Sequence, residues 1–182
     1  MRCSWVDEKC KVYARYHDEE WGKPVYEDCK LFEMLILEGF QAGLSWLTVL
    51  KKRQAFREAF AEFNPQKVAA FDDSKVEKML QNPKIIRSRL KIDAAINNAK
   101  VFLKIQQEFG SFAKYLWHFT AGKIMHYNNF PSQTHNELSD IISKDLKKRG
   151  MKYAGSVIIY SYLQAVGIID DHEPQCFCHT KV

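Results

Sequence analysis

Residues 31–46 read LFEMLILEGFQAGLSW, and this stretch decides the expected fold. Positions 31–37 are apolar nearly all round a helical wheel, which indicates a helix buried on every side. Gly39 and Gly43 loosen the end of this helix. Ser45 is a suitable N-cap for a second helix. The apolar positions of that second helix are Trp46, Val49, Leu50 and Phe56. We therefore predict two helices within residues 30–60.

Helical spacing of apolar residues recurs outward from this stretch. Asp73 or Ser74 can begin a helix that ends before Pro83. Further helices are predicted over 92–103, 111–119, 136–148 and 156–166, the last of them stopping at Gly167. Residues 120–135 show no clear period and are expected to form a loop. Because no alternating strand pattern competes, we predict an all-α fold, and the length of 182 residues suits a single domain, 1–182.

Composition limits the classes of protein to which the chain can belong. No stretch reaches the roughly 18 uncharged apolar residues of a membrane helix. Asp7, Glu8 and Lys9 stand where a signal peptide needs its apolar run. We therefore expect a cytoplasmic protein without a membrane partner, which acts as a monomer. The net charge of +5 favours a nucleic-acid partner, although many unrelated enzymes carry as much.

A basic turn, LKKRGMKYAG over residues 146–155, separates two predicted helices. Gly150 permits a tight bend, and the next helix begins near Gly155 with free backbone N–H groups that attract phosphate. Lys148, Arg149 and Lys152 add positive charge. The turn is typical of a helix-hairpin-helix motif, which grips the DNA backbone without reading sequence. The alternative is an ordinary helical hairpin with a solvated basic turn.

Cysteines and histidines gather near the two ends of the chain. Because the chain has 5 cysteines, an odd count, a full disulfide framework is disfavoured. Cys3, His17, His172 and Cys176 would form a sound tetrahedral zinc set, with His172 and Cys176 on one side of a helical turn. Four protein ligands leave no open position, so such a site would be structural and would join the two termini. The alternatives are free thiols beside unrelated histidines, or competition from other ligands, namely Cys10, Cys178 and His179.

Glu38 is the unusual residue of the buried helix, because a carboxylate on an apolar face is costly unless a function requires it. It can be the recognition group of a pocket. It can equally cap a neighbouring helix or reach water past Gly39.

Aromatic residues are dense around the predicted N-terminal region. They are Trp5, Tyr13, Tyr16, Trp21 and, after the first helix, Trp46. Such residues usually belong to the core. A cationic ring, however, is well held between aromatic faces with a carboxylate at its edge.

These residues occur in runs that resemble the 3-methyladenine DNA glycosylase I family. The runs are Cys3-Ser4-Trp5-Val6, Tyr16 to Gly22, Leu31 to Met34, Leu37 to Trp46, Ile85-Ile86-Arg87, Lys91-Ile92, Asn98-Ala99, Leu146 to Gly150, and Asp171-His172 with Cys176. The resemblance covers nearly the whole chain, and the block from Glu38 to Trp46 is its most specific part.

The resemblance implies a helix-hairpin-helix DNA glycosylase fold with one structural zinc ion (Zn2+). It places the zinc on Cys3, His17, His172 and Cys176. It places the base pocket on Glu38, Tyr16 and Trp46, with Tyr13, Trp21 and Trp5 nearby. It also implies that Leu44, after Gly43, enters the gap left by the flipped nucleotide.

The implied activity is hydrolysis of the N-glycosidic bond of 3-methyladenine in double-stranded, alkylated DNA, with free 3-methyladenine as product. The base would leave the stack to enter the pocket. Trp46 and Tyr16 would stack on it, and Glu38 would accept hydrogen bonds from its edge. No lysine stands out as an amine nucleophile, so we expect hydrolysis without a lyase step. Two rival hypotheses are a zinc-stapled DNA-binding module without catalysis and a glycosylase for a different lesion.

Overall fold

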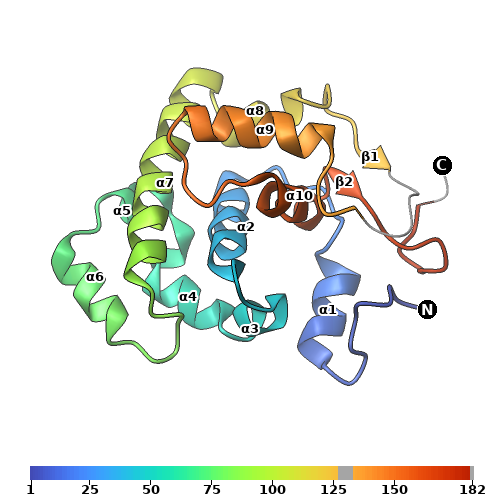
Figure 1. Cartoon of the computed structure of the whole chain (residues 1–182), viewed down its shortest axis with the longest axis horizontal. Coiled ribbons are helices and arrows are strands. Elements are labelled where there is room, and N and C mark those ends of the chain that lie inside the picture. The colour runs from blue at the N-terminus through green and yellow to red at the C-terminus, as the bar shows by residue number, and fades with distance from the viewer. Residues whose placement is uncertain (127–132, 181–182) are drawn as a thin grey trace.

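A computed structural model gives the fold and describes residues 1–126 and 133–180. Within these ranges the chain is mostly helical (Figure 1). The elements are α1 (Lys11–Glu19), α2 (Asp28–Gln41), α3 (Trp46–Lys51), α4 (Arg53–Ala59), the 3₁₀ helix η1 (Ala61–Phe63), α5 (Pro65–Ala69), α6 (Asp73–Leu80), α7 (Arg89–Phe109), α8 (Phe112–His118), β1 (Met125–His126), α9 (Glu137–Lys148), α10 (Ser156–Ala165) and β2 (Ile169–Asp170).

Helix α2 is the centre of the molecule, as the apolar run predicted. All of its residues from Leu31 to Phe40 are buried, and α7, α8, α10 and α3 pack around it (Figure 1). Gly39 brings α2 close to the loop after α9, because a Cβ atom at this position would lie 3.4 Å from the Cβ of Tyr153. This close approach places the C-terminal part of α2 beside the predicted hairpin.

The second predicted helix is in fact two helices. Ser45 is the N-cap of α3, and its side chain accepts a hydrogen bond from the backbone N–H of Thr48. The helix ends at Lys51, and Lys52 links it to α4. At this break the Lys52 ammonium turns outward and donates to the carbonyls of Pro83 and Lys84. A local apolar period could not show this long-range contact.

The remaining predicted helices are present with shifted ends. The N-cap of α6 is Asp72 rather than Asp73 or Ser74, because its carboxylate accepts the N–H of Lys75. Helix α7 is longer at both ends than predicted and is followed by Gly110 at φ +84°. Helix α10 ends at Ala165, just before Gly167. A Cβ atom at Gly167 would lie 2.2 Å from the backbone of Lys23, so only glycine fits there.

Helices α1 and α5 were not predicted. The apolar face of α1 is short, but Tyr13, Tyr16 and His17 have the i, i+3, i+4 spacing that could have identified it. The loop predicted over 120–135 needs one correction, because β1 within it pairs in parallel with β2, Met125 opposite Ile169. Its residues 127–132 lie outside the described part of the chain.

A buried ion-pair network fixes α4 against α2. The carboxylate of Glu33 accepts from Arg53 at 2.8 Å and from Arg57 at 2.8 Å. Arg53 also donates to Glu20, just after α1. Burial opposes ionisation of Glu33, but the two guanidinium groups outweigh it and lower its pKa to about 2. The charged residues on this side of α2 are therefore paired within the protein.

No helix within the described residues has the length and apolar character needed to cross a membrane.

Candidate active site and metal cluster

Glu38 lies on α2 at the wall of a cavity, with 4% of its surface exposed. No group of the described residues donates a hydrogen bond to its carboxylate. Burial raises its pKa to about 8 because the charged form is poorly solvated. An isolated, buried carboxyl group of this kind is a candidate recognition group for a cation.

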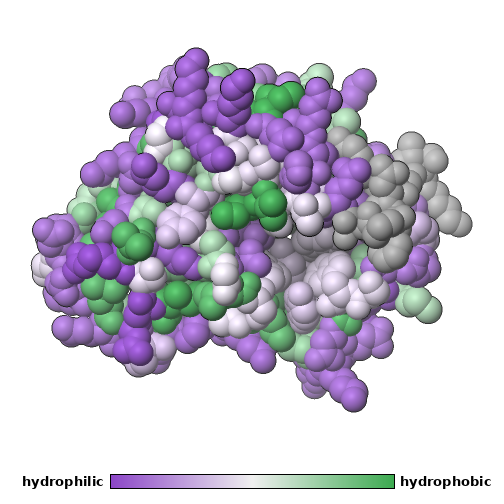
Figure 2. All heavy atoms as spheres, in the orientation of Figure 1, coloured by the Kyte–Doolittle hydropathy of each residue, from purple (hydrophilic) through white to green (hydrophobic). Residues whose placement is uncertain are grey.

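The cavity has a volume of about 470 Å³, and Figure 2 shows the surface hollowed between α1 and the α9–α10 region. Its residues come from α1, α2, α3, α10, the segment before α9 and both ends of the chain. They are Ser4, Trp5, Tyr13, Tyr16, Trp21, Glu38, Gln41, Trp46, Gln133, Thr134, Val157, Tyr160, Ser161, Gln164, Asp171, His172, Glu173 and Pro174. All six residues that the sequence analysis proposed for base binding or catalysis therefore share one cavity.

Tyr16 and Trp46 line the same cavity as this carboxyl group. Their ring centroids are 5.4 Å apart at 51°. Burial, followed by the nearby charge of Glu38, raises the pKa of Tyr16 well above its usual value, so its hydroxyl stays neutral. The indole Nε1 of Trp46 is buried, and no described residue accepts its hydrogen. The cavity thus offers an aromatic wall, a hydroxyl and an unpaired donor beside the carboxyl group.

The other predicted aromatic residues form a cluster between the cavity and the chain ends. The Trp5 ring lies 5.0 Å from Trp21 and 5.1 Å from Tyr13. Trp21 in turn contacts the His172 ring edge-on at 4.6 Å. The aromatic cluster therefore belongs both to the core and to the cavity wall, so the two interpretations of these residues are not exclusive.

Helix α10 supplies a cavity wall that the sequence analysis missed. Val157, Tyr160, Ser161 and Gln164 line the cavity. Their i, i+3, i+4, i+7 spacing is one face of a helix, so a helical wheel could have grouped them. Asp171 and Gln41 also line the cavity, and only the tertiary structure places them there.

Gly43 and Leu44 form an exposed turn after α2. Gly43 has φ +78°, and the Leu44 N–H donates to the carbonyl of Gln41 at 2.7 Å. The Gln41 amide returns a hydrogen bond to the carbonyl of Leu44. Lys91 of α7 donates to the carbonyls of Phe40 and Ala42 and so holds the end of α2. The turn presents Leu44 with 39% of its surface exposed.

The predicted basic hairpin connects α9 to α10. Gly150 has φ +91°, and its N–H donates to Lys147 while the Met151 N–H donates to Leu146. These two bonds form a Schellman ending of α9. Gly155 caps α10 without a side-chain hydrogen bond, so the first N–H groups of that helix remain available. Lys148 and Lys152 are exposed beside this helix start.

Arg149 differs from the neighbouring lysines because it has partners within the protein. Its guanidinium donates to Asp145 at 2.6 Å and to Glu108 at 2.6 Å. It also lies over the rings of Phe109 and Tyr115. These contacts order the hairpin, and the DNA contact predicted for Arg149 stays a prediction.

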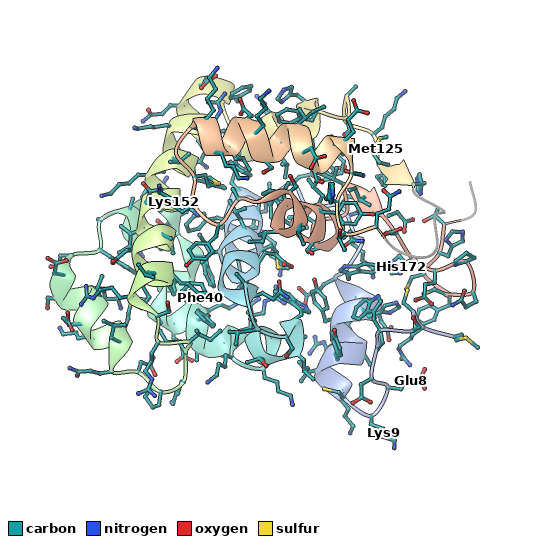
Figure 3. The ribbon with its side chains drawn as sticks, viewed as in Figure 1. Glu8, Lys9, Phe40, Met125, Lys152 and His172 are labelled. Carbon is teal, nitrogen blue, oxygen red and sulfur yellow. The ribbon has the colours of Figure 1, made fainter. Side chains whose placement is uncertain are left out.

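Two asparagines of α7 hold the hairpin in place. Asn98 is buried, and its amide exchanges two hydrogen bonds with the backbone of Lys152, at 2.8 and 2.7 Å. Asn97 donates to the carbonyl of Gly150. Figure 3 shows Lys152 lying beside α7. The hairpin conformation is thus set by α7 as well as by its own turn.

Cys3, His17, His172 and Cys176 meet at one point, where all four are buried and their donor atoms lie within 4.8 Å of one another. Sulfur and nitrogen are 3.5 Å apart for Cys3–His172, and 3.4 and 3.7 Å apart for Cys176 with His17 and His172. Ligands around a tetrahedral zinc ion would place these atoms about 3.6 Å apart. The donor set and its spacing therefore fit zinc, and Figure 1 shows α1 and the segment after β2 on the same side of the molecule.

Neighbouring groups support this cluster. The carboxylate of Asp18 lies 2.9 Å from Nδ1 of His17. The other ring nitrogen, Nε2, faces Cys176 in the cluster. Such a carboxylate orients a metal-binding imidazole. Gly22 has φ +75°, and a Cβ atom there would lie 2.8 Å from Nε2 of His172. A side chain at position 22 would therefore displace one of the candidate ligands.

The expected geometry of the C-terminal ligands needs a correction. His172 and Cys176 lie in a segment of turns instead of a helical turn, with the Cys176 N–H donating to the carbonyl of Glu173. The turn still brings the two side chains together. Cys10, Cys178 and His179, the competing ligands, are outside the four-residue cluster. His179 uses its Nδ1 on the carbonyl of His172.

Comparisons with known proteins agree with this geometry. A family model described as methyladenine glycosylase matches residues 5–179. The DNA-3-methyladenine glycosylase of Haemophilus influenzae is 43% identical to the chain over 184 residues, which cover 99% of the chain and 98% of that relative.

Solved structures are similar over the same length. A crystal structure of 3-methyladenine DNA glycosylase I has a TM-score of 0.94 and 46% identity, and the match covers 99% of this chain and 100% of that chain. A tyrosine-to-phenylalanine variant of 3-methyladenine DNA glycosylase I, solved in complex with 3-methyladenine, has a TM-score of 0.91 and 40% identity, with 95% of each chain covered.

Proposed function

The chain belongs to the methyladenine glycosylase family, and from this membership we propose that it is a DNA-3-methyladenine glycosylase, which hydrolyses the N-glycosidic bond of 3-methyladenine in alkylated DNA. The observation that carries the proposal is the buried carboxyl group of Glu38 in a cavity flanked by Tyr16 and Trp46.

The cavity suits a methylated adenine because of charge. Methylation at N3 gives the base in DNA a fixed positive charge, and this charge favours the ionised form of Glu38. Trp46 and Tyr16 supply faces for stacking, and the Trp46 N–H is a donor for an acceptor atom of the base. Unmodified adenine lacks the charge and gains less from the carboxylate, so selectivity arises in binding.

The chemistry needs little more than positioning. A cationic base is already a good leaving group, and water can then replace it at the sugar. Among the described residues that line the cavity there is no lysine, which supports hydrolysis without a lyase step. Extrusion of a base from the stack costs a few kcal/mol, and the cost is lower for a poorly stacked lesion.

We assign DNA binding to two surfaces on either side of the cavity. The N–H groups at the start of α10, with Lys148 and Lys152, would hold backbone phosphates, and Gly150 would shape the turn that presents them. Leu44, held out by Gly43, would fill the space left by the extruded nucleotide. Double-stranded alkylated DNA is therefore the proposed substrate.

Zinc is the proposed cofactor of the Cys3, His17, His172 and Cys176 cluster. All four positions would be protein ligands, so the ion would have no site for substrate. Its contribution would be to hold the two chain ends beside the cavity, where Trp5 and His172 form part of the wall.

Release of free base from methylated duplex DNA tests the proposal. The wild-type protein should release 3-methyladenine, detected by chromatography. Glu38→Gln keeps the size of the side chain but removes the charge, so we expect at least about a hundredfold slower release and weaker binding of free 3-methyladenine. Full activity and full affinity of this variant would contradict the role of Glu38.

Measurement of the released base also distinguishes this proposal from the two rival hypotheses. A zinc-stapled DNA-binding module would bind duplex DNA but release no base. A glycosylase for a different lesion would release another base from damaged DNA. Exposed Lys67→Ala on the short helix α5, remote in sequence from both DNA-binding surfaces, is a suitable control for nonspecific charge loss.

A further inference from the structure

Both backbone polar groups of Leu44 are hydrogen-bonded to a single residue, Gln41. The Leu44 N–H donates to the carbonyl of Gln41 at 2.7 Å, and the side-chain amide of Gln41 donates to the carbonyl of Leu44 at 3.1 Å. Among the described residues, no other group donates to the carbonyl of Leu44. The backbone conformation at Leu44 therefore depends on one glutamine.

Gln41 also belongs to the cavity. It is the last residue of α2, and it lines the cavity together with Glu38. Because the two residues are three positions apart, they lie on the same face of the helix. Glu38 is buried, whereas Gln41 is partly exposed. A single side chain thus lines the cavity and holds the segment that carries Leu44.

The turn around Leu44 is otherwise loosely packed. Gly43 has φ +78°, and a Cβ atom there would meet nothing within 4 Å. The Leu44 side chain is exposed, so packing holds it only in part. Lys91 donates to the carbonyl of Ala42, which restrains the turn before Gly43. The two hydrogen bonds to Gln41 restrain Leu44 itself, after the glycine.

Such a restraint matters for a side chain that enters DNA. An apolar side chain that inserts between bases must unstack them, at a cost of a few kcal/mol per base step. A loop that is already fixed in the required conformation loses less conformational entropy on binding than a mobile loop. Fixing the backbone of Leu44 in advance therefore favours its insertion.

We propose that Gln41 is a positioning residue for extrusion of the base, because it fixes the backbone of Leu44 in the conformation that enters the duplex. The inference rests on the proposed glycosylase function, in which Leu44 fills the gap left by the extruded nucleotide. Gln41 acts through Leu44 and does not contact the reacting atoms. The rate of base release from duplex DNA should therefore depend on Gln41, while the affinity of the cavity for free base should not.

Gln41→Met tests this assignment, because methionine has a similar length but no hydrogen-bond donor in its side chain. We expect single-turnover release of 3-methyladenine from methylated duplex DNA to slow about two- to tenfold, the effect of one neutral hydrogen bond. Affinity for free 3-methyladenine, followed by the fluorescence of the cavity tryptophans, should stay within about twofold, because no group assigned to base recognition is changed. Gln41→Ala is a second variant, in case methionine packs poorly at this position.

A duplex that contains a tetrahydrofuran abasic-site analogue beside a 2-aminopurine base measures the insertion of Leu44 directly. Filling of the gap changes the stacking of the 2-aminopurine and hence its fluorescence. The change should be smaller with Gln41→Met than with the wild type, and Leu44→Ala should abolish it. If Gln41 acts through Leu44, Gln41→Met should not slow base release further when it is added to Leu44→Ala.

Gln66→Met is the matched control, because Gln66 is an exposed glutamine of α5 that does not line the cavity. It should behave as the wild type in each assay. An unchanged rate in both Gln41 variants would overturn the inference, as would additive effects in the double variant. A loss of free-base affinity would also overturn it, because Gln41 would then be a base contact.

Failure of the proposed function has a different signature. In that case the wild type would release no base from methylated duplex DNA. The 2-aminopurine signal needs no catalysis, so it decides the role of Gln41 separately, and equal signals from the wild type and Gln41→Met would contradict that role.

Discussion

Burial has different consequences for two carboxyl groups of α2, because only one of them has charged partners. Glu33 and Glu38 are both nearly inaccessible to solvent, yet their pKa values move in opposite directions. Arg53 and Arg57 compensate the burial of Glu33, which stays ionised. Among the described residues Glu38 has no such partner, and burial raises its pKa to about 8, which favours the protonated form at neutral pH. The difference marks Glu38 as the carboxyl group that a cationic ligand can use.

The raised pKa of Glu38 predicts a pH-dependent stability. Its folded pKa of about 8 lies above the ordinary value of 4.5, so the folded state binds the proton more tightly than the unfolded state between these values. The free energy of unfolding should therefore fall as pH rises through this window, by about 1.4 kcal/mol per pH unit from this group. Glu38→Gln removes the contribution of this group to the pH dependence of the free energy of unfolding.

Urea unfolding of the wild type and of Glu38→Gln at several pH values between 5 and 8 checks this. The stability difference should shift in favour of the variant as pH rises, because all other titrating groups are shared. Parallel pH profiles of the two proteins would show that Glu38 titrates normally.

At the scale of elements, α7 connects both proposed DNA-binding surfaces. Lys91 near its start holds the end of α2, behind the turn that presents Leu44. Asn97 and Asn98, two turns later, hold the hairpin. The helix thus fixes the spacing of two segments that lie far apart in the sequence.

We predict that Asn98→Ala weakens binding of duplex DNA and leaves binding of free 3-methyladenine unchanged. The substitution leaves the backbone N–H and carbonyl of Lys152 without partners and should cost about 1–3 kcal/mol of stability. Thermal unfolding and salt-dependent DNA binding measure the two effects. Lys100→Ala, exposed on the same helix, is the control. Equal losses of DNA and free-base binding would indicate general loosening of the fold instead.

At the scale of the whole molecule, the chain closes on itself at the metal cluster. Cys3 and His17 come from one end, and His172 and Cys176 come from the other. The cavity lies next to this closure and takes Trp5 and His172 as part of its wall. The integrity of the site therefore depends on residues that hold the termini together.

Removal of zinc should destabilise the protein and impair base binding together. A chelator, or Cys176→Ser, should lower the melting temperature by at least about 5 °C, because buried ligands lose their common partner. Metal analysis should give one zinc per chain for the wild type and less for the variant. Cys29→Ser, outside the cluster, should behave as the wild type. A melting temperature that is insensitive to chelation and to Cys176→Ser would argue against a structural metal.

Helices with strong local signals were accessible from the sequence. The apolar run of α2, the Ser45 cap and the Gly150 turn depend on neighbours a few residues away, so the pattern of residues is sufficient to identify them. The motifs that resemble the glycosylase family likewise identified the cavity residues on α1, α2 and α3. Helix α1 was missed because its signal is short and its aromatic residues were read as a cluster rather than as one helical face.

Three features were decided only by the tertiary structure. Arg149 has partners 4 and 41 positions away, the α10 face turns toward the cavity, and Asp171 joins the cavity wall with two hydrogen bonds from that face. Each depends on which distant groups packing brings within hydrogen-bond distance, and no local period encodes that choice. The sequence by itself therefore determined the helices and the chemical inventory of the site. Packing between distant segments determined which of those groups are paired and which are left for a ligand.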